Sequence, residues 1–157
     1  MTTRAFIHGL ESSGKGAKGA YFKERYPDMI VEDFLGDFGE RMAKLNAILA
    51  DRDELILVGS SYGGLMATVF ALRTAKKIRK LILLAPALSH MPPEMYRQIT
   101  LDFPVILYHG DQDDVVPPSP VQGIARTLFT DLTYHQVSDD HALHQTFFTI
   151  DWDNLLS

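Results

Sequence analysis

The stretch Leu55-Ile56-Leu57-Val58-Gly59-Ser60-Ser61-Tyr62-Gly63-Gly64 decides the predicted fold. An apolar run typical of a buried strand ends in the pentapeptide G-x-S-x-G, and residues 65–72 can form a helix directly after it. A strand, a sharp turn and a helix around a central serine, here Ser61, are the context of a nucleophile elbow. Gly59 and Gly63 would let the strand and the helix approach closely. Taken alone, the pentapeptide fits an ordinary glycine-rich loop equally well.

The composition predicts one globular domain over residues 1–157, because 46% of the residues are hydrophobic and 22% are charged. The net charge of -5 offers no basic field for nucleic acid or an anionic membrane, so neither is expected as a partner. The absence of cysteine excludes disulfides, thiolate metal sites and a cysteine nucleophile. With no signal peptide or membrane-spanning run in the sequence, we expect a cytoplasmic protein.

Short apolar runs alternate with longer amphipathic segments along the whole chain. The predicted strands are residues 4–8, 29–33, 55–58, 80–84, 105–108 and 132–137. The predicted helices are residues 17–26, 39–50, 62–76, 93–99, 119–129 and 144–155. This alternation indicates an α/β fold with a doubly wound parallel sheet. Ligands bind such sheets at the carboxyl ends of the strands, where the motifs below would converge.

A serine hydroxyl needs a histidine to accept its proton and an acid to orient that histidine. The acidic loop after the predicted strand at residues 105–108 offers Asp111, Asp113 and Asp114 for the acid. A solvated acidic loop is the alternative interpretation of all three.

Three histidines near the carboxyl terminus compete for the role of the base. His141 lies in the loop after the last predicted strand, where a base can reach the serine, and is the best candidate on position. His144 opens the last predicted helix and is still possible. His135 falls inside the strand, which favours a packed or surface histidine.

An oxyanion hole requires two backbone N–H groups aimed at the reaction intermediate. The N–H of Tyr62, the residue after the serine, would be one of them. The loop after the first strand would supply the other, because Gly9 permits a bend that turns the N–H of Leu10 into the site.

Three motifs carry a resemblance to a known superfamily. They are His8-Gly9-Leu10-Glu11-Ser12-Ser13, the elbow around Ser61, and His109-Gly110-Asp111-Gln112-Asp113-Asp114-Val115-Val116-Pro117, with Asp140-His141 behind them. In this order they resemble the α/β-hydrolases, and within them the small bacterial esterases of the YqiA-like group. The resemblance covers nearly the whole chain.

The resemblance implies a serine hydrolase acting on small carboxylic esters or thioesters through an acyl-enzyme, with no cofactor and no metal. In the family's H-G-x-x-D-x-V-x-P pattern the triad acid falls on Asp113, and the family's late histidine falls on His141. The family's oxyanion residue falls on Leu10. The remaining motif histidines, His8 and His109, would be structural.

The chain departs from larger members of the superfamily in two respects. It lacks the antiparallel strands that open their sheets, and residues 85–102 leave no room for a cap domain. We therefore expect a minimal core of about six parallel strands in the order 2-1-3-4-5-6. Phe34, Leu35, Leu88 and Met91 are candidates for the wall of a substrate site, and helix packing is the alternative for them.

Two other classes of protein compete with a hydrolase. The first loop reads Gly9-Leu10-Glu11-Ser12-Ser13-Gly14-Lys15-Gly16, nearly the P-loop G-x-x-x-x-G-K-[ST] of nucleotide-binding proteins. Position 16 is glycine, so the hydroxyl that binds Mg²⁺ is missing. A non-catalytic interaction protein with a hydrolase fold is the other alternative. The sequence does not indicate the natural substrate or the oligomeric state.

Overall fold

The computed structural model describes residues 1–10 and 12–157, so Glu11 of the first loop lies outside the described residues. Its six strands form one parallel sheet in the order β2-β1-β3-β4-β5-β6, as predicted. The strands are β1 (Thr3–Ile7), β2 (Ile30–Val31), β3 (Leu55–Ser60), β4 (Ile78–Leu84), β5 (Val105–Gly110) and β6 (Leu132–Val137).

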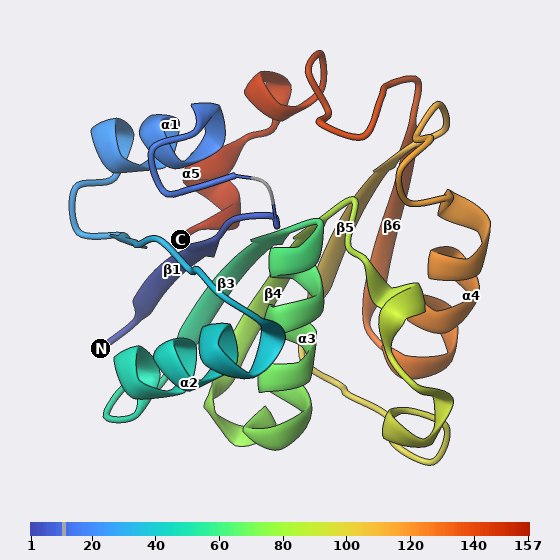
Figure 1. Cartoon of the computed structure of the whole chain (residues 1–157), viewed down its shortest axis with the longest axis horizontal. Coiled ribbons are helices and arrows are strands. Elements are labelled where there is room, and N and C mark those ends of the chain that lie inside the picture. Colours follow the sequence, from blue (N-terminus) through green and yellow to red (C-terminus); the bar gives the residue numbers. More distant parts are fainter. Residues whose placement is uncertain (11) are drawn as a thin grey trace.

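Helices cover both faces of this sheet, which is why residues 55–58 of β3 and 81–84 of β4 are apolar at every position (Figure 1). One face carries α2 (Phe38–Leu49), α3 (Tyr62–Arg73) and α4 (Pro118–Leu128), and the other carries α1 (Ala17–Arg25) and α5 (Trp152–Leu155). Short 3-10 turns complete the fold at Ala75–Lys77, Leu88–His90, Pro93–Met95 and Phe147–Thr149.

The core consists of two clusters, one on each face of the sheet. Leu55 and Leu57 of β3 belong to the cluster under α2, α3 and α4, whereas Ile56 and Val58 point to the opposite face. There they pack with aromatic side chains of α1 and of the carboxyl-terminal segment. The rings of Phe22 and Trp152 pack edge to face, with their centroids 4.9 Å apart. Each fully buried aliphatic side chain of β3 contributes about 1.5–3 kcal/mol to the free energy of unfolding. The central strands therefore contribute much of the stability of the sheet.

Two predicted helices are wrong. Residues 93–99 contain only the 3-10 turn Pro93–Met95, because most of the side chains after it stay exposed and bury no helical face. Residues 144–155 form the 3-10 turn Phe147–Thr149 and the separate helix α5. The backbone is extended at Ile150, and the Asp151 side chain accepts the Asn154 N–H and starts the new helix.

Strand β2 is shorter than predicted, at two residues. The chain leaves the sheet after Val31 because the next residues bind the first loop: Asp33 accepts the Gly14 N–H at 2.7 Å, and the Phe34 N–H donates to His8 at 2.8 Å. The residues after β2 therefore hold the loop that follows β1 in place instead of continuing the strand pairing.

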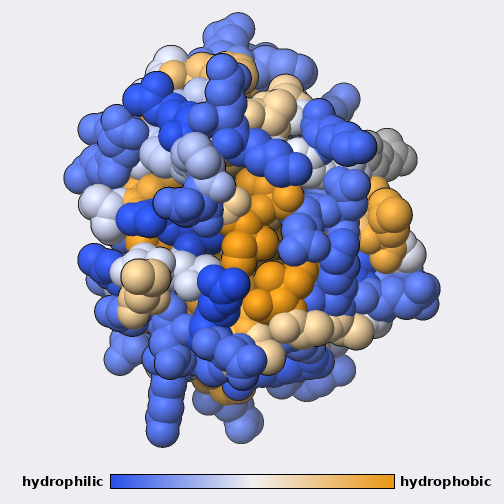
Figure 2. All heavy atoms as spheres, turned by 90° about the vertical axis from the view of Figure 1, so that its left-hand side faces the viewer, coloured by the Kyte–Doolittle hydropathy of each residue, from blue (hydrophilic) through white to orange (hydrophobic). Residues whose placement is uncertain are grey.

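The side of the molecule that carries β2 shows a band of hydrophobic side chains with hydrophilic ones around it (Figure 2). Ile30 of this edge strand is only partly buried. Of the helices in residues 1–10 and 12–157, none has the length and apolar character needed to cross a bilayer.

Two glycine-to-alanine changes should have opposite effects on the free energy of unfolding. A Cβ at Gly63, in the first turn of α3, would lie 2.0 Å from the Ile7 carbonyl oxygen, so Gly63→Ala should destabilise the fold by about 3 kcal/mol or more. Gly123 in α4 has open space around its Cβ position, and Gly123→Ala should stabilise the fold by about 0.5–1 kcal/mol. Urea unfolding measures both, and equal effects would contradict the close approach of β1 and α3.

Candidate active site

Ser61 lies at the sharp turn between β3 and α3 and has a backbone conformation that residues other than glycine rarely adopt. Its φ is 55° and its ψ is -114°, a strain of roughly 1–3 kcal/mol. The Ser61 N–H donates to the Leu84 carbonyl at 2.9 Å, and the Ser61 carbonyl accepts the N–H of Ala87 at 3.0 Å. The neighbouring strand β4 and its loop therefore hold the strained turn and leave the hydroxyl free to project.

Small residues around the serine make this turn possible, as the sequence predicts. A Cβ at Gly59 would lie 2.5 Å from the Gly63 carbonyl oxygen, and one at Gly64 would lie 2.6 Å from the Pro86 side chain. The strand, the helix and the loop after β4 approach too closely at these points for any larger residue.

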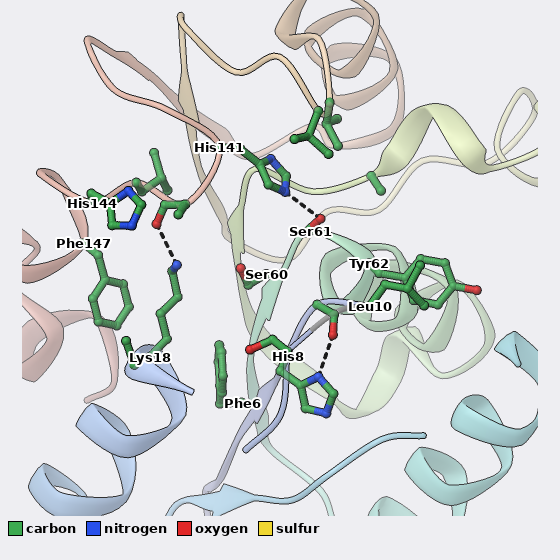
Figure 3. Close-up of a pocket in the computed structure, with 18 of the residues that line it drawn as sticks. Phe6, His8, Leu10, Lys18, Ser60, Ser61, Tyr62, His141, His144 and Phe147 are labelled. Atoms are coloured by element: carbon green, nitrogen blue, oxygen red, sulfur yellow. Dashed lines mark hydrogen bonds between the residues drawn. The ribbon is translucent and has the colours of Figure 1, made fainter. Parts of the chain in front are cut away.

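The structure brings together Ser61, His141 and Asp113. The His141 Nε2 atom lies 3.0 Å from the Ser61 Oγ atom (Figure 3). The His141 Nδ1 atom lies 2.7 Å from the Asp113 Oδ2 atom. Since a carboxylate only accepts, the Nδ1–H donates to Asp113 and leaves Nε2 free to accept the serine proton. These residues come from the ends of β3, β5 and β6, which meet at one edge of the sheet.

The other histidines considered for the base lie away from this arrangement. The His144 side chain is 75% exposed and its Nδ1 atom lies 2.6 Å from the Asp140 Oδ2 atom. His135 is exposed on β6, where its ring stacks on Tyr108 with the ring centroids 4.5 Å apart.

Asp113 differs from the other two aspartates of its loop in burial and in partners. It is 7% exposed, whereas Asp111 and Asp114 are exposed. Its Oδ1 atom accepts the N–H groups of Val115 at 2.9 Å and Val116 at 2.8 Å. These backbone donors hold the carboxylate in a fixed orientation toward His141.

His109 is a second histidine on the Asp113 carboxylate. It is fully buried, and its Nε2 atom lies 2.8 Å from the Val116 carbonyl oxygen and 3.1 Å from the Asp113 Oδ2 atom. Burial lowers the pKa of His109, which favours the neutral ring with its one proton on Nε2, where both acceptors lie. The same Oδ2 atom therefore faces an N–H of His109 and an N–H of His141.

His8 organises the loop that follows β1. Its Nε2 atom accepts the Phe34 N–H at 2.8 Å, so its proton lies on Nδ1, which donates to the Gly9 carbonyl at 2.7 Å. Burial lowers the pKa of His8 and favours this neutral ring. Because C=O and N–H point in opposite directions in a trans peptide, and the Gly9 carbonyl points to His8, the Leu10 N–H points away from His8.

A cavity of about 630 Å³ opens beside Ser61. Its walls include Leu10, Tyr62 and His141 on one side and aromatic rings of β1 and the carboxyl-terminal segment on the other. The lining side chains of that second side include Phe6, Lys18, Leu143, His144, Phe147 and Phe148. Tyr62 and His90 also line a second cavity of about 360 Å³.

The four predicted wall residues lie outside the larger cavity's lining. Phe34 and Leu88 are buried in the core, and Leu35 is 69% exposed. Met91 lines the second cavity, together with the apolar side chains of Leu65 and Met95.

The P-loop-like segment binds its own chain. The Gly14 N–H donates to the Asp33 carboxylate at 2.7 Å, and the Lys15 N–H donates to the Ser13 hydroxyl at 3.0 Å. A phosphate-binding loop needs such N–H groups for its ligand. The N–H groups of Gly14 and Lys15 are therefore not available to a phosphate in this structure.

Sequence reasoning missed Asp139, which organises the loop that carries His141. Asp139 is buried and accepts the N–H groups of Asp140 at 2.8 Å, Gln145 at 3.1 Å and Thr146 at 2.8 Å. Burial raises the pKa of Asp139, but hydrogen bonds, led by those from Thr146, outweigh it and lower the pKa overall. An aspartate preceding a short polar loop is the pattern of such a cap and would have been the available signal.

The fold and the position of the serine define an α/β-hydrolase. A family model described as serine aminopeptidase, S33, matches residues 7–101, more than half of the chain. The chain therefore belongs to this family of hydrolases. The matched range contains Ser61 but ends before Asp113 and His141. No curated protein sequence matches the chain.

Solved structures show the same fold at low sequence identity. The mouse α/β-hydrolase domain-containing protein 10 is similar, with 21% identity, a TM-score of 0.77, and coverage of 99% of this chain and 90% of that one. A monoacylglycerol lipase of Paleococcus ferrophilus has 14% identity, a TM-score of 0.75, and coverage of 98% and 93%. Est1E of Butyrivibrio proteoclasticus, solved with ferulic acid bound, has 15% identity, a TM-score of 0.75, and coverage of 99% and 87%.

The Asp139 carboxylate should stabilise the fold fully at neutral pH and less at acid pH. Its pKa is lowered on folding, so its contribution is complete above the unfolded value of about 3.9 and is lost as pH falls through the lower folded value. Asp139→Asn should lower the free energy of unfolding at pH 7 by about 1–3 kcal/mol, and this difference should shrink below pH of about 4.

The control for Asp139 is its neighbour Asp140, whose side chain is half-exposed and whose carboxylate binds His144. Asp140→Asn should change stability by less than about 0.5 kcal/mol. Urea unfolding at several pH values measures both variants. A difference between wild type and Asp139→Asn that is constant with pH would contradict the role of the charge.

Proposed function

We propose that this protein is a serine hydrolase that cleaves small carboxylic esters or thioesters through an acyl-enzyme. The observation that carries the proposal is the hydrogen-bonded series from Ser61 through His141 to Asp113. Its atoms stand in the order that nucleophilic catalysis by serine requires. The cavity beside Ser61 gives a substrate access to the hydroxyl.

In the first half of the reaction, the Ser61 Oγ atom attacks the substrate carbonyl while His141 Nε2 takes its proton. Asp113 stabilises the imidazolium through the Nδ1–H. The N–H groups of Leu10 and Tyr62 donate to the oxyanion of the tetrahedral intermediate. The bond to the leaving group then breaks, and His141 returns the proton to the departing alcohol or thiol.

In the second half, water replaces the leaving group. His141 takes a proton from the water molecule as its oxygen attacks the acyl carbonyl, and the same two N–H groups stabilise the second oxyanion. The bond to Ser61 Oγ breaks, and His141 returns the proton to that oxygen. The carboxylic acid leaves and the enzyme is restored.

Ser61 lines the larger cavity, and the smaller cavity adjoins that one at the residue after the serine, so together they suit a substrate with groups on both sides of the scissile bond. Tyr62 and His90 line both of them. The smaller cavity is apolar, with Leu65, Met91 and Met95 in its wall, and fits an acyl group of modest size. We therefore assign the acyl part of the substrate to the smaller cavity and the leaving group to the larger one.

Ser61 should be the residue that becomes acylated. A fluorophosphonate should label the protein at Ser61, as located by mass spectrometry of peptides, and Ser61→Ala should lower kcat for p-nitrophenyl acetate by about 10⁴-fold or more. Ser60, the neighbouring hydroxyl in the cavity wall, is the control, and Ser60→Ala should keep the labelling. An adduct on Ser60, or none, would overturn the proposal.

The three aspartates of the β5 loop should differ in their effect on turnover. Asp113→Asn should lower kcat by about 10⁴-fold, because an amide does not stabilise the imidazolium of His141. Asp111→Asn and Asp114→Asn should stay close to wild type, since both side chains are exposed. Equal losses in all three variants, measured with p-nitrophenyl acetate, would show a general effect on the loop.

A further inference from the structure

Lys18 places a positive charge in the wall of the larger cavity. Among the described residues that line this cavity, it alone carries an ammonium or guanidinium group. Lys18 comes from the first turn of α1, and Figure 3 shows its side chain running along the cavity between Phe6 and Phe147. The surrounding wall is mostly apolar, so a substrate in this cavity would meet a cation at Lys18.

The ammonium has unused hydrogen-bonding capacity. Its Nζ atom donates to the Ala142 carbonyl at 2.6 Å, which accounts for one of three N–H groups. The ion pairs of the described residues do not include Lys18. A neutral carbonyl is therefore its hydrogen-bond partner, and within residues 1–10 and 12–157 no carboxylate forms an ion pair with it.

The two carboxylates that act on Lys18 from a distance have partners of their own. Asp139 accepts three backbone N–H groups, and Asp140 binds the His144 ring. Phe147 lies under the ammonium, with Nζ 5.5 Å from the ring centroid. Lys18 is partly buried, and this burial lowers its pKa because it disfavours the charged form. An anion that enters the cavity would provide the missing solvation.

The position of Lys18 indicates which part of the substrate it would contact. His141 must deliver its proton to the leaving group, so the leaving group lies beside His141. Ala142, the residue that Lys18 binds, directly follows His141 in the chain. Lys18 therefore stands on the leaving-group side of the scissile bond.

We propose that the larger cavity selects esters or thioesters whose alcohol or thiol part carries an anionic group, a carboxylate or a phosphate, and that Lys18 pairs with that group. This rests on the proposed hydrolase function and adds a substrate class to it. Lys18 acts here as a specificity residue, since it would contact a part of the substrate that lies away from the scissile bond.

The experiment compares pairs of acetate esters that differ in the charge of the leaving group. 3-Acetoxybenzoate and 4-acetoxybenzoate carry a carboxylate, and the two matching acetoxybenzamides are neutral and of nearly the same shape. 4-Acetoxyphenyl phosphate tests phosphate as the anion, against phenyl acetate. Values of kcat/KM are measured because they report on acylation, in which the leaving group departs.

Wild type should prefer at least one carboxylate ester, or the phosphate, over its neutral partner. Lys18→Met should lower kcat/KM for that anionic ester by about tenfold, the scale of one charge-assisted hydrogen bond, and leave the neutral partner within about twofold. Lys18→Arg should keep most of the preference. Lys15→Met is the matched control, because Lys15 is exposed in the same segment and lies outside the cavity lining, and it should change neither rate.

Three results would separate the possible failures. If wild type shows no preference for an anionic leaving group, the proposal for Lys18 is wrong. If Lys18→Met lowers both members of each pair equally, Lys18 only braces the His141 loop through Ala142, and the proposal is again wrong. In both cases fluorophosphonate labelling of Ser61 would persist, whereas loss of labelling in wild type would remove the hydrolase function on which the proposal rests.

Discussion

The strained backbone at Ser61 is the constraint on which the rest of the structure depends. A residue with a φ of 55° persists only when its surroundings determine it, and here the strands on both sides contribute. β4 and its loop bind the Ser61 backbone, while β1 approaches α3 so closely that Gly63 must be glycine. The buried parallel sheet therefore supplies the rigidity that keeps the hydroxyl exposed at the end of β3.

Two buried histidines, His8 and His109, hold the loops around the serine in fixed positions. His8 joins the first loop to the backbone of Phe34, and His109 joins the Asp113 carboxylate to the Val116 carbonyl. Burial lowers the pKa of both rings and so favours their neutral form, and a neutral imidazole with fixed partners has one tautomer and one orientation. A small protein without a cap domain can in this way position two loops with side chains from its own core.

The cavity shows how a minimal hydrolase core can still recognise a substrate. Its walls come from the first loop, from α1 and from the segment after β6, which Asp139 holds in place. Lys18 links two of these parts, because it stands on α1 and binds Ala142 in the third. The same contacts that shape the loop of His141 thus bring a cation close to the proposed path of the leaving group.

Local pattern in the sequence predicted the parallel sheet and the serine at the turn, because apolar runs, their spacing and the glycines around Ser61 act over a few residues. The strand order was predicted from the resemblance to the α/β-hydrolases. The helices at residues 93–99 and 144–155 were wrong because their ends depend on burial and capping by distant parts of the chain. The resemblance had predicted Asp113 and His141, but only the tertiary structure shows the contacts that join them to Ser61, and only it shows the loop contacts of Asp139 and the position of Lys18 in the cavity wall. Those contacts depend on which side chains three separate strand ends bring within hydrogen-bonding distance, and spacing along the chain does not contain that information.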